Sequence, residues 1–268
     1  MDGNQTAPAP LTATSYNSGD QTTGFTPTGP APIAGAPTGP APLTATYGGT
    51  GQNQRLSFGT TTYANGSQGV LSASTGGTST YYERDPSGTL IAERGAGGEF
   101  YYITDGLGST VALVDTTGTV QATYTYDPYG NTTTISGPNP VIANGNPFRY
   151  ASGYDDTATG LYHFGQRYYN PTTGRWTQQD SLNNPLDPAN GNRYAYTGGD
   201  PVNRTDPSGA ISDCASAVLS TAGGAFALVA GLVSIGTGVG APVGLIGANF
   251  GALGLGDGID RLSNGACS

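Results

Sequence analysis

Residues 100–114 read Phe-Tyr-Tyr-Ile-Thr-Asp-Gly-Leu-Gly-Ser-Thr-Val-Ala-Leu-Val, and this stretch predicts a β-hairpin. Its aromatic and β-branched residues favour a strand at the start, and Asp105 to Gly108 supply the chemistry of a turn. An aspartate accepts hydrogen bonds from its own backbone in such a turn, and the glycine tolerates the positive φ that follows. The run from Ser109 to Val114 completes the hairpin as a second strand.

The same pattern recurs along the chain at a nearly constant interval. The turn residues Asn65, Asp85, Asp105 and Asp127, each preceded by tyrosine-bearing sequence, lie 20, 20 and 22 residues apart. One hairpin is not stable alone, but stacked hairpins form a continuous twisted sheet with one tyrosine-lined face buried. The sequence therefore predicts a mainly β protein, built as an antiparallel ribbon of hairpins.

Composition narrows the class of protein. Charged residues make up 10% of the 268 residues, which argues against a coiled coil or a long solvated helix. The net charge of −9 is opposite in sign to that of a typical nucleic-acid binder, so no nucleic-acid partner is predicted. Two cysteines and the single His163 make no convincing zinc ligand set, so we expect no metal and no cofactor. His163 and Trp176 are predicted to be packed core residues.

A longer motif follows the repeats. It begins at Phe148-Arg-Tyr, continues through Thr-Gly-Leu-Tyr-His-Phe-Gly-Gln-Arg-Tyr-Tyr-Asn-Pro-Thr-Thr-Gly-Arg-Trp-Thr-Gln-Gln-Asp at 159–180, and closes on Asp206-Pro-Ser-Gly209. The Tyr-Asp-x-x-Gly units resemble YD repeats, and the longer motif resembles the RHS-repeat-associated core domain. The resemblance implies a β-ribbon that spirals into a hollow shell in full-length relatives, with the core domain plugging one end. This chain is too short for a closed shell, so we expect an open sheet or a partial shell.

Composition and motifs divide the chain into four parts. Residues 1–47 form a Pro-, Gly- and Thr-rich segment that is either extended or made of degenerate repeats. Residues 48–137 carry the YD-type hairpin repeats, residues 138–209 resemble the RHS core domain, and residues 210–268 form a variable Gly-rich hydrophobic tail.

The resemblance also implies that the core domain cuts the chain and releases the tail. By resemblance, the catalytic carboxylates map to Asp180 and Asp206, and the cleavage signature maps to Pro207, Gly209 and Ala210. Two close carboxylates separate their pKa values, so that one serves as the acid and the other as the base. Arg175 or Arg193 would keep one carboxylate ionised.

Three departures from the family pattern leave an uncut chain open. Ala210 stands where the family has a bulky Leu or Trp, and Gln179-Asp180-Ser181 replaces the usual Pro-Asp-Pro. The interval of 26 residues between Asp180 and Asp206 is also longer than usual. The bland alternative is that Asp206 only closes a turn, as Asp85 does in an identical Asp-Pro-Ser-Gly stretch.

The tail has no charged residue between Asp213 and Asp257. Since about 20 helical residues cross a bilayer core, this predicts a hydrophobic α-helical hairpin that contacts a membrane through residues 215–256. Cys214 and Cys267 flank the apolar stretch, and they form a disulfide in an oxidising compartment or stay unpaired. We therefore expect a secreted or cell-surface protein with membrane association. Residues 1–5 show no signal-peptide pattern, which leaves another export route or a longer parent chain.

Three functions fit these observations. The chain is an RHS-type carrier that presents, and with self-cleavage releases, a small membrane-active effector in bacterial competition; the tail is then its cargo, and an immunity protein is a further partner. Alternatively, it is an aspartyl-type autoprotease whose only substrate is its own chain near Ala210. In the third case it is a non-enzymatic surface β-repeat protein that its hydrophobic hairpin anchors.

Overall fold

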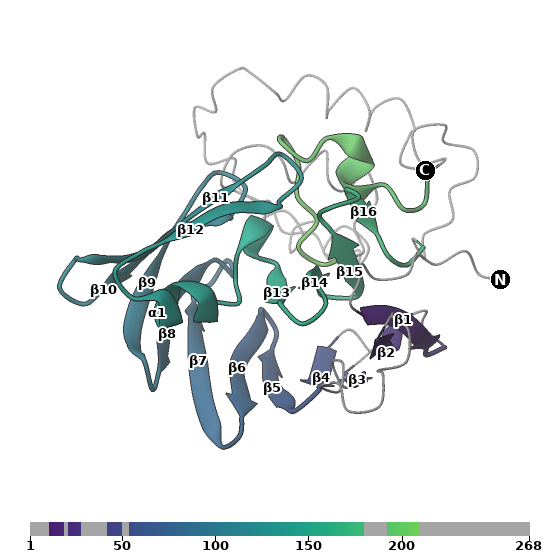
Figure 1. Ribbon diagram of the computed structural model, residues 1–268, viewed down its shortest axis with the longest axis horizontal. Coiled ribbons are helices and arrows are strands. Elements are labelled where there is room, and N and C mark those ends of the chain that lie inside the picture. The colour runs from purple at the N-terminus through teal and green to yellow at the C-terminus, as the bar shows by residue number, and fades with distance from the viewer. Residues whose placement is uncertain (1–10, 19–20, 28–41, 50–53, 180–191, 210–268) are drawn as a thin grey trace, which may run out of the picture.

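A computed structural model describes residues 11–18, 21–27, 42–49, 54–179 and 192–209. This part of the chain is mainly antiparallel β-structure, which confirms the predicted fold class. Twelve strands form one open sheet in the order in which they occur in the sequence, and four further strands form a second, smaller sheet (Figure 1). The predicted helical hairpin lies outside the described residues, and no helix among those described is long and apolar enough to span a bilayer.

We call β1 to β12 the ribbon, and the described residues between 140 and 209, which contain α1, η2, β13 to β16 and η4, the inner layer. The ribbon strands are β1 (Leu11–Tyr16), β2 (Thr22–Pro27), β3 (Leu43–Gly48), β4 (Gln54–Phe58), β5 (Thr61–Gly66), β6 (Gly69–Thr75), β7 (Thr78–Arg84), β8 (Leu90–Gly95), β9 (Gly98–Thr104), β10 (Thr110–Asp115), β11 (Val120–Tyr126) and β12 (Thr132–Ser136). The inner layer comprises α1 (Pro140–Gly145), η2 (Tyr150–Ser152), β13 (Tyr154–Asp156), β14 (Leu161–Phe164), β15 (Arg167–Asn170), β16 (Arg175–Trp176) and η4 (Tyr196–Gly199). Three ribbon strands, β1 to β3, thus lie in the Pro-rich N-terminal stretch.

Aspartates close the turns along one edge of the ribbon. In the β7–β8 turn, Asp85 Oδ1 accepts hydrogen bonds from the backbone N–H groups two and four residues further along, at 2.8 and 2.9 Å. Asp105 and Asp127 make the same pair of bonds in the next two turns on that edge. Gly88 completes its turn at φ 93°, where a side chain would be strained. The Asp-x-x-Gly motif therefore specifies the reversal that joins successive strands.

Tyrosine pairs show how the ribbon separates its two faces. On β7, Tyr82 is 5% exposed while its neighbour Tyr81 is 59% exposed, because successive side chains in a strand point to opposite faces. The buried position recurs in each hairpin, at Tyr63, Tyr82, Tyr102 and Tyr124. The ribbon therefore has one aromatic face that must be covered.

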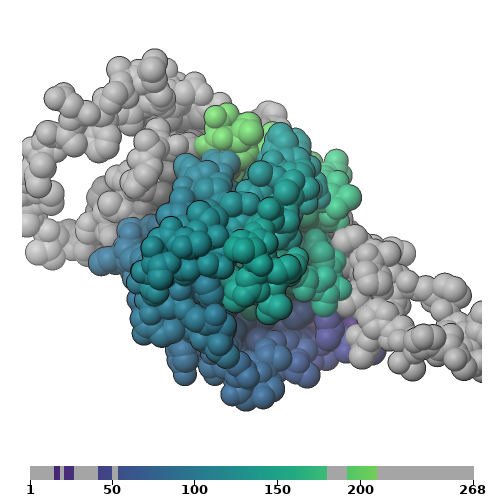
Figure 2. All heavy atoms as spheres, turned by 60° about the vertical axis from the view of Figure 1, so that its left-hand side comes forward, coloured from purple at the N-terminus to yellow at the C-terminus, as the bar shows by residue number. Residues whose placement is uncertain are grey.

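The inner layer covers this aromatic face. The strands of the ribbon follow one another around an arc, and β13 to β16 lie within the arc (Figure 1). In the space-filling view, the blue and teal atoms of the ribbon lie directly against the green atoms of the inner layer (Figure 2). Edge-to-face aromatic pairs join the two layers: Phe25 with Tyr168, Tyr63 with Tyr154, and Tyr82 with Phe148, with ring centroids 5.2, 5.4 and 4.8 Å apart. Such pairs add directional packing to the burial of apolar area.

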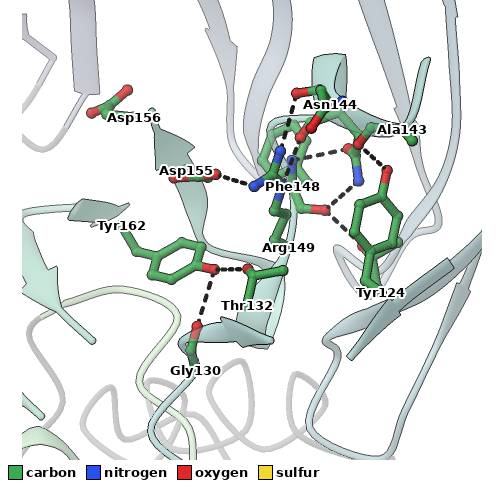
Figure 3. A network of polar contacts seen from close by, with 12 residues as sticks. Tyr124, Gly130, Thr132, Ala143, Asn144, Phe148, Arg149, Asp155, Asp156 and Tyr162 are labelled. Atoms are coloured by element: carbon green, nitrogen blue, oxygen red, sulfur yellow. Dashed lines mark hydrogen bonds and ion pairs between the residues drawn. The ribbon is translucent and has the colours of Figure 1, made fainter. Parts of the chain in front are cut away.

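Polar contacts tie the last ribbon strands to the inner layer (Figure 3). The hydroxyl of Tyr124 on β11 donates to the carbonyl oxygen of Ala143 on α1 at 2.8 Å. The hydroxyl of Tyr162 on β14 donates to the carbonyl oxygen of Gly130 at 3.2 Å. Because a buried hydroxyl is costly without a partner, these bonds fix the inner layer relative to the ribbon.

Arg149 organises the chain between α1 and β13. Its guanidinium pairs with Asp155 at 2.6 Å and donates to the carbonyl oxygens of Asn144 and Asn146 at 3.0 and 3.1 Å. Asp155 points toward Arg149, whereas the adjacent Asp156 points away from it (Figure 3). Burial raises the pKa of Asp155 to about 6, although Arg149 opposes that rise.

Candidate functional site

The last described residues of the chain, 206–209, lie on the turn between β14 and β15. The backbone N–H of Gln166 in this turn donates to the carbonyl oxygen of Ser208 at 3.0 Å, and the N–H of Gly209 donates to that of Asp206 at 3.2 Å. Asp206 and Gly209 are buried, whereas Pro207 is exposed. We call residues 206–209 the exit segment, because the tail begins at the next residue.

Arg167, the first residue of β15, holds both ends of the exit segment. Its Nη2 lies 3.1 Å from Oδ2 of Asp206, and its Nε donates to the carbonyl oxygen of Gly209 at 2.5 Å. Its guanidinium carbon lies 4.2 Å from the ring centroid of Trp176, which gives a cation–π contact. Both charged side chains are almost completely buried. A buried carboxylate needs such a partner, so Arg167 allows Asp206 to be ionised at this position.

The predicted site residues fall in different places. Asp206 lies at the end of the described chain and forms an ion pair with Arg167, whereas Arg175 is exposed on β16. Asp180, Ala210, Cys214, Cys267 and the apolar stretch 215–256 lie outside the described residues.

The chain that leads to Asp180 packs beside the strand that carries Arg167. Gln178 is buried, and its Oε1 accepts a hydrogen bond from the backbone N–H of Tyr168 at 2.9 Å. Its Nε2 donates to the hydroxyl of Thr22 at 2.7 Å. Two residues before Asp180, the backbone is therefore fixed next to β15.

Sequence reasoning missed Arg167, although the sequence carries a signal for it. The strands on either side of the β14–β15 turn are buried at every position, so an arginine at the start of β15 points into a packed layer. An arginine in such a layer needs buried acceptors. The run Gly-Gln-Arg-Tyr-Tyr at 165–169, read in this way, predicts a nearby carboxylate partner.

A second buried ion pair joins the ribbon to the inner layer and was also not predicted. Arg55 of β4 pairs with Asp156 of β13 and donates to the hydroxyls of Tyr168 and Tyr63 at 3.0 and 3.2 Å. Burial raises the pKa of Asp156, and Arg55 opposes this rise. The guanidinium carbon of Arg55 also lies 4.6 Å from the ring centroid of Tyr63. The pair is fully enclosed, which indicates a role in holding the two layers together.

His163 lies next to this pair on β14. It is 8% exposed, its ring centroid lies 4.9 Å from that of Tyr168, and its Nε2 has no hydrogen-bond partner among the described residues. Burial, together with the nearby Arg55, holds the pKa of His163 well below its usual range. Among the residues that the structure describes, no group of three His, Cys, Asp or Glu side chains is placed to hold a metal ion.

Relatives of this chain are found among very different proteins. The tRNA nuclease WapA of Bacillus subtilis (strain 168) is 35% identical over 112 residues, which are 41% of this chain and 5% of WapA. Toxin subunit YenC2 of Yersinia entomophaga is 37% identical over 97 residues, 36% of this chain and 10% of YenC2. Teneurin-4 of Homo sapiens is 38% identical over 104 residues, 38% of this chain and 4% of the teneurin. This chain thus spans only a small part of the length of these relatives.

A solved structure shares the fold. The crystal structure of TcdB2-TccC3 matches with a TM-score of 0.58 at 20% identity, over 77% of this chain and 11% of that chain. The family model described as Teneurin YD-shell matches residues 47–202. These residues include most of the ribbon and most of the inner layer, and they make up more than half of the 268 residues. The chain therefore belongs to the YD-shell family of RHS and YD-repeat proteins.

Proposed function

We propose that this chain is the carrier end of an RHS-type toxin, which presents residues 210–268 as its cargo. One observation carries the proposal: the exit segment, directly before those residues, packs on the β14–β15 turn, and its buried ends Asp206 and Gly209 are bound by Arg167. An aspartate that only closed a turn would not need a buried arginine. Similarity to a toxin subunit and to tRNA nucleases supports a carrier role.

We further propose that the chain releases this cargo by cutting itself after Ala210. Asp206, kept ionised by Arg167, takes a proton from a water molecule, whose oxygen attacks the carbonyl carbon of Ala210. Asp180 in its protonated form polarises the carbonyl oxygen and gives its proton to the departing nitrogen as the C–N bond breaks. In this proposal, Arg167 takes the role that the sequence suggested for Arg175 or Arg193.

Intact mass spectrometry of the purified chain tests self-cleavage. We expect a fragment that ends near Ala210, and we expect Asp206→Asn and Asp180→Asn to leave the chain whole. Asp85→Asn is the matched control, because Asp85 lies in an identical Asp-Pro-Ser-Gly stretch that forms an exposed ribbon turn. Cleavage that persists in Asp206→Asn would exclude this carboxylate from the reaction.

For the cargo, we propose a membrane-active effector delivered by a secreted or cell-surface carrier. The uncharged stretch between Asp213 and Asp257 supports this proposal, because it is long enough to enter a bilayer. The sequence of the tail also lacks the set of charged and nucleophilic residues that a nuclease would need. Dye release from liposomes on addition of a 211–268 peptide measures the activity. No release at micromolar peptide would remove the effector proposal.

A non-enzymatic surface module anchored by its tail is the second candidate. Ala210 favours it, because the bulky residue that the family places there is missing. In that case the intact mass stays unchanged under all conditions, and the whole chain sediments with liposomes.

A further inference from the structure

Two backbone segments cross at a pair of glycines where the exit segment meets the β14–β15 turn. Gly165 has a φ of 47° and Gly209 a φ of 62°. A Cβ atom at Gly165 would come closer than 3.0 Å to the carbonyl oxygen of Ser208, and one at Gly209 would come equally close to the carbonyl oxygen of Phe164. Each glycine therefore makes room for the backbone of the other segment.

Two hydrogen bonds to backbone carbonyl oxygens of the exit segment depend on this close approach. Gln166 N–H reaches the carbonyl oxygen of Ser208 at 3.0 Å, and Arg167 Nε reaches that of Gly209 at 2.5 Å. Moving the exit segment away by the size of a methyl group would lengthen both bonds beyond hydrogen-bonding distance. Neither contact uses a side chain of the exit segment.

We propose that Gly165 and Gly209 are positioning residues, which seat the chain before the tail by letting the two backbones approach closely. This inference rests on the proposed self-cleavage for its functional consequence: the last residues before the proposed cleavage point are held on the β14–β15 turn.

Amide hydrogen exchange and tail release, measured on the full chain, test the proposal. In Gly165→Ala we expect the Gln166 amide to exchange about tenfold faster or more, the factor that corresponds to about 1.4 kcal/mol of lost local stability. Tail release should slow by a similar factor. Gly209→Ala perturbs the same contact from the other side and should give the same two results.

Gly76→Ala is the matched control. Gly76 has a φ of 59°, close to that of Gly209, but a Cβ there would meet nothing within 4 Å. It therefore shares the cost of a positive φ without the crossing, and it should leave both Gln166 exchange and tail release unchanged.

The two readouts separate this proposal from the proposed cleavage. If the parent chain is never cut but Gly165→Ala still accelerates exchange at Gln166, the positioning role of the two glycines is supported and the proposed self-cleavage is refuted. If Gln166 exchange is unchanged in Gly165→Ala and Gly209→Ala, or changes as much in Gly76→Ala, the glycines do not position the segment. Should Gly165→Ala fail to fold, as judged by circular dichroism, Gly209→Ala at the edge of the inner layer decides the question.

Discussion

Arg55 and Asp156 show how strongly single residues connect the ribbon to the inner layer. Both side chains are 2% exposed, so neither charge has water as a substitute partner. We expect Arg55→Met to lower the free energy of unfolding by about 3–5 kcal/mol, because it leaves Asp156 buried and unpaired. Urea unfolding followed by fluorescence of Trp176 measures the loss.

The double variant provides the control for this loss. Arg55→Met with Asp156→Leu removes both charges and should recover most of the stability, since replacing a whole buried pair by apolar residues is often nearly neutral. A double variant as unstable as Arg55→Met alone would mean that the loss comes from the tyrosine hydroxyls and not from the stranded carboxylate.

His163 makes the free energy of unfolding depend on pH, and its lowered pKa sets the direction of that dependence. Burial lowers its pKa in the folded chain well below 6.5, so the unfolded chain binds the proton first as the pH falls. The free energy of unfolding should therefore drop below pH 6.5, by up to about 1.4 kcal/mol per pH unit from this residue. Asp155 acts in the opposite direction below pH 6, because its raised pKa makes the folded chain the better proton acceptor.

Comparing the parent with His163→Gln isolates the histidine from Asp155 and from the groups that face it, Tyr47, Arg55 and Tyr168. The difference in unfolding free energy between the two proteins should change between pH 7.5 and pH 5.5. A difference that stays constant over this range would show that His163 takes up its proton equally in both states.

At the scale of the strand, adjacent tyrosines of β7 test which face is buried. Tyr82→Ala should cost about 3–5 kcal/mol, because it opens a cavity against Phe148 in the inner layer. Tyr81→Ala, one residue earlier and pointing outward, should change stability little. Thermal unfolding of the two variants measures the contrast, and equal losses would contradict the assigned alternation.

The hairpins of the ribbon could be predicted from the sequence because the interactions that form each turn join residues close together in the chain. Asp85, Asp105 and Asp127 each make their turn with backbone groups within four residues, so a short window of sequence is enough. Asp115 closes a turn on the opposite edge with the same chemistry, although the interval of about twenty does not include it. The local chemistry was thus a better guide than the period.

Pairs between distant segments could not be predicted in the same way. Arg55 and Asp156 are 101 positions apart, and Arg167 and Asp206 are 39 apart. Composition reports only that arginines are few, and it does not say which carboxylate each one meets. The motif resemblance pointed to Asp206, but the choice of Arg167 over Arg175 depends on burial: β15 is buried at every position, whereas Arg175 on β16 is exposed.

For the whole molecule, the ribbon should depend on the inner layer. Residues 1–137 alone would leave the face with Tyr63, Tyr82, Tyr102 and Tyr124 uncovered, and a large exposed apolar face promotes association. We expect this fragment to form oligomers or aggregates in sedimentation velocity, whereas residues 1–209 should stay monomeric. A monomeric 1–137 fragment with the parent's β-sheet signal would show that the ribbon folds independently.

The strand order of the ribbon, in which each strand bonds only to the strands before and after it in the sequence, has an evolutionary consequence. Duplication or deletion of a two-strand unit shifts the later strands along without rethreading the chain. The length of the ribbon can therefore change in steps of one hairpin, while the inner layer and the exit segment are inherited unchanged.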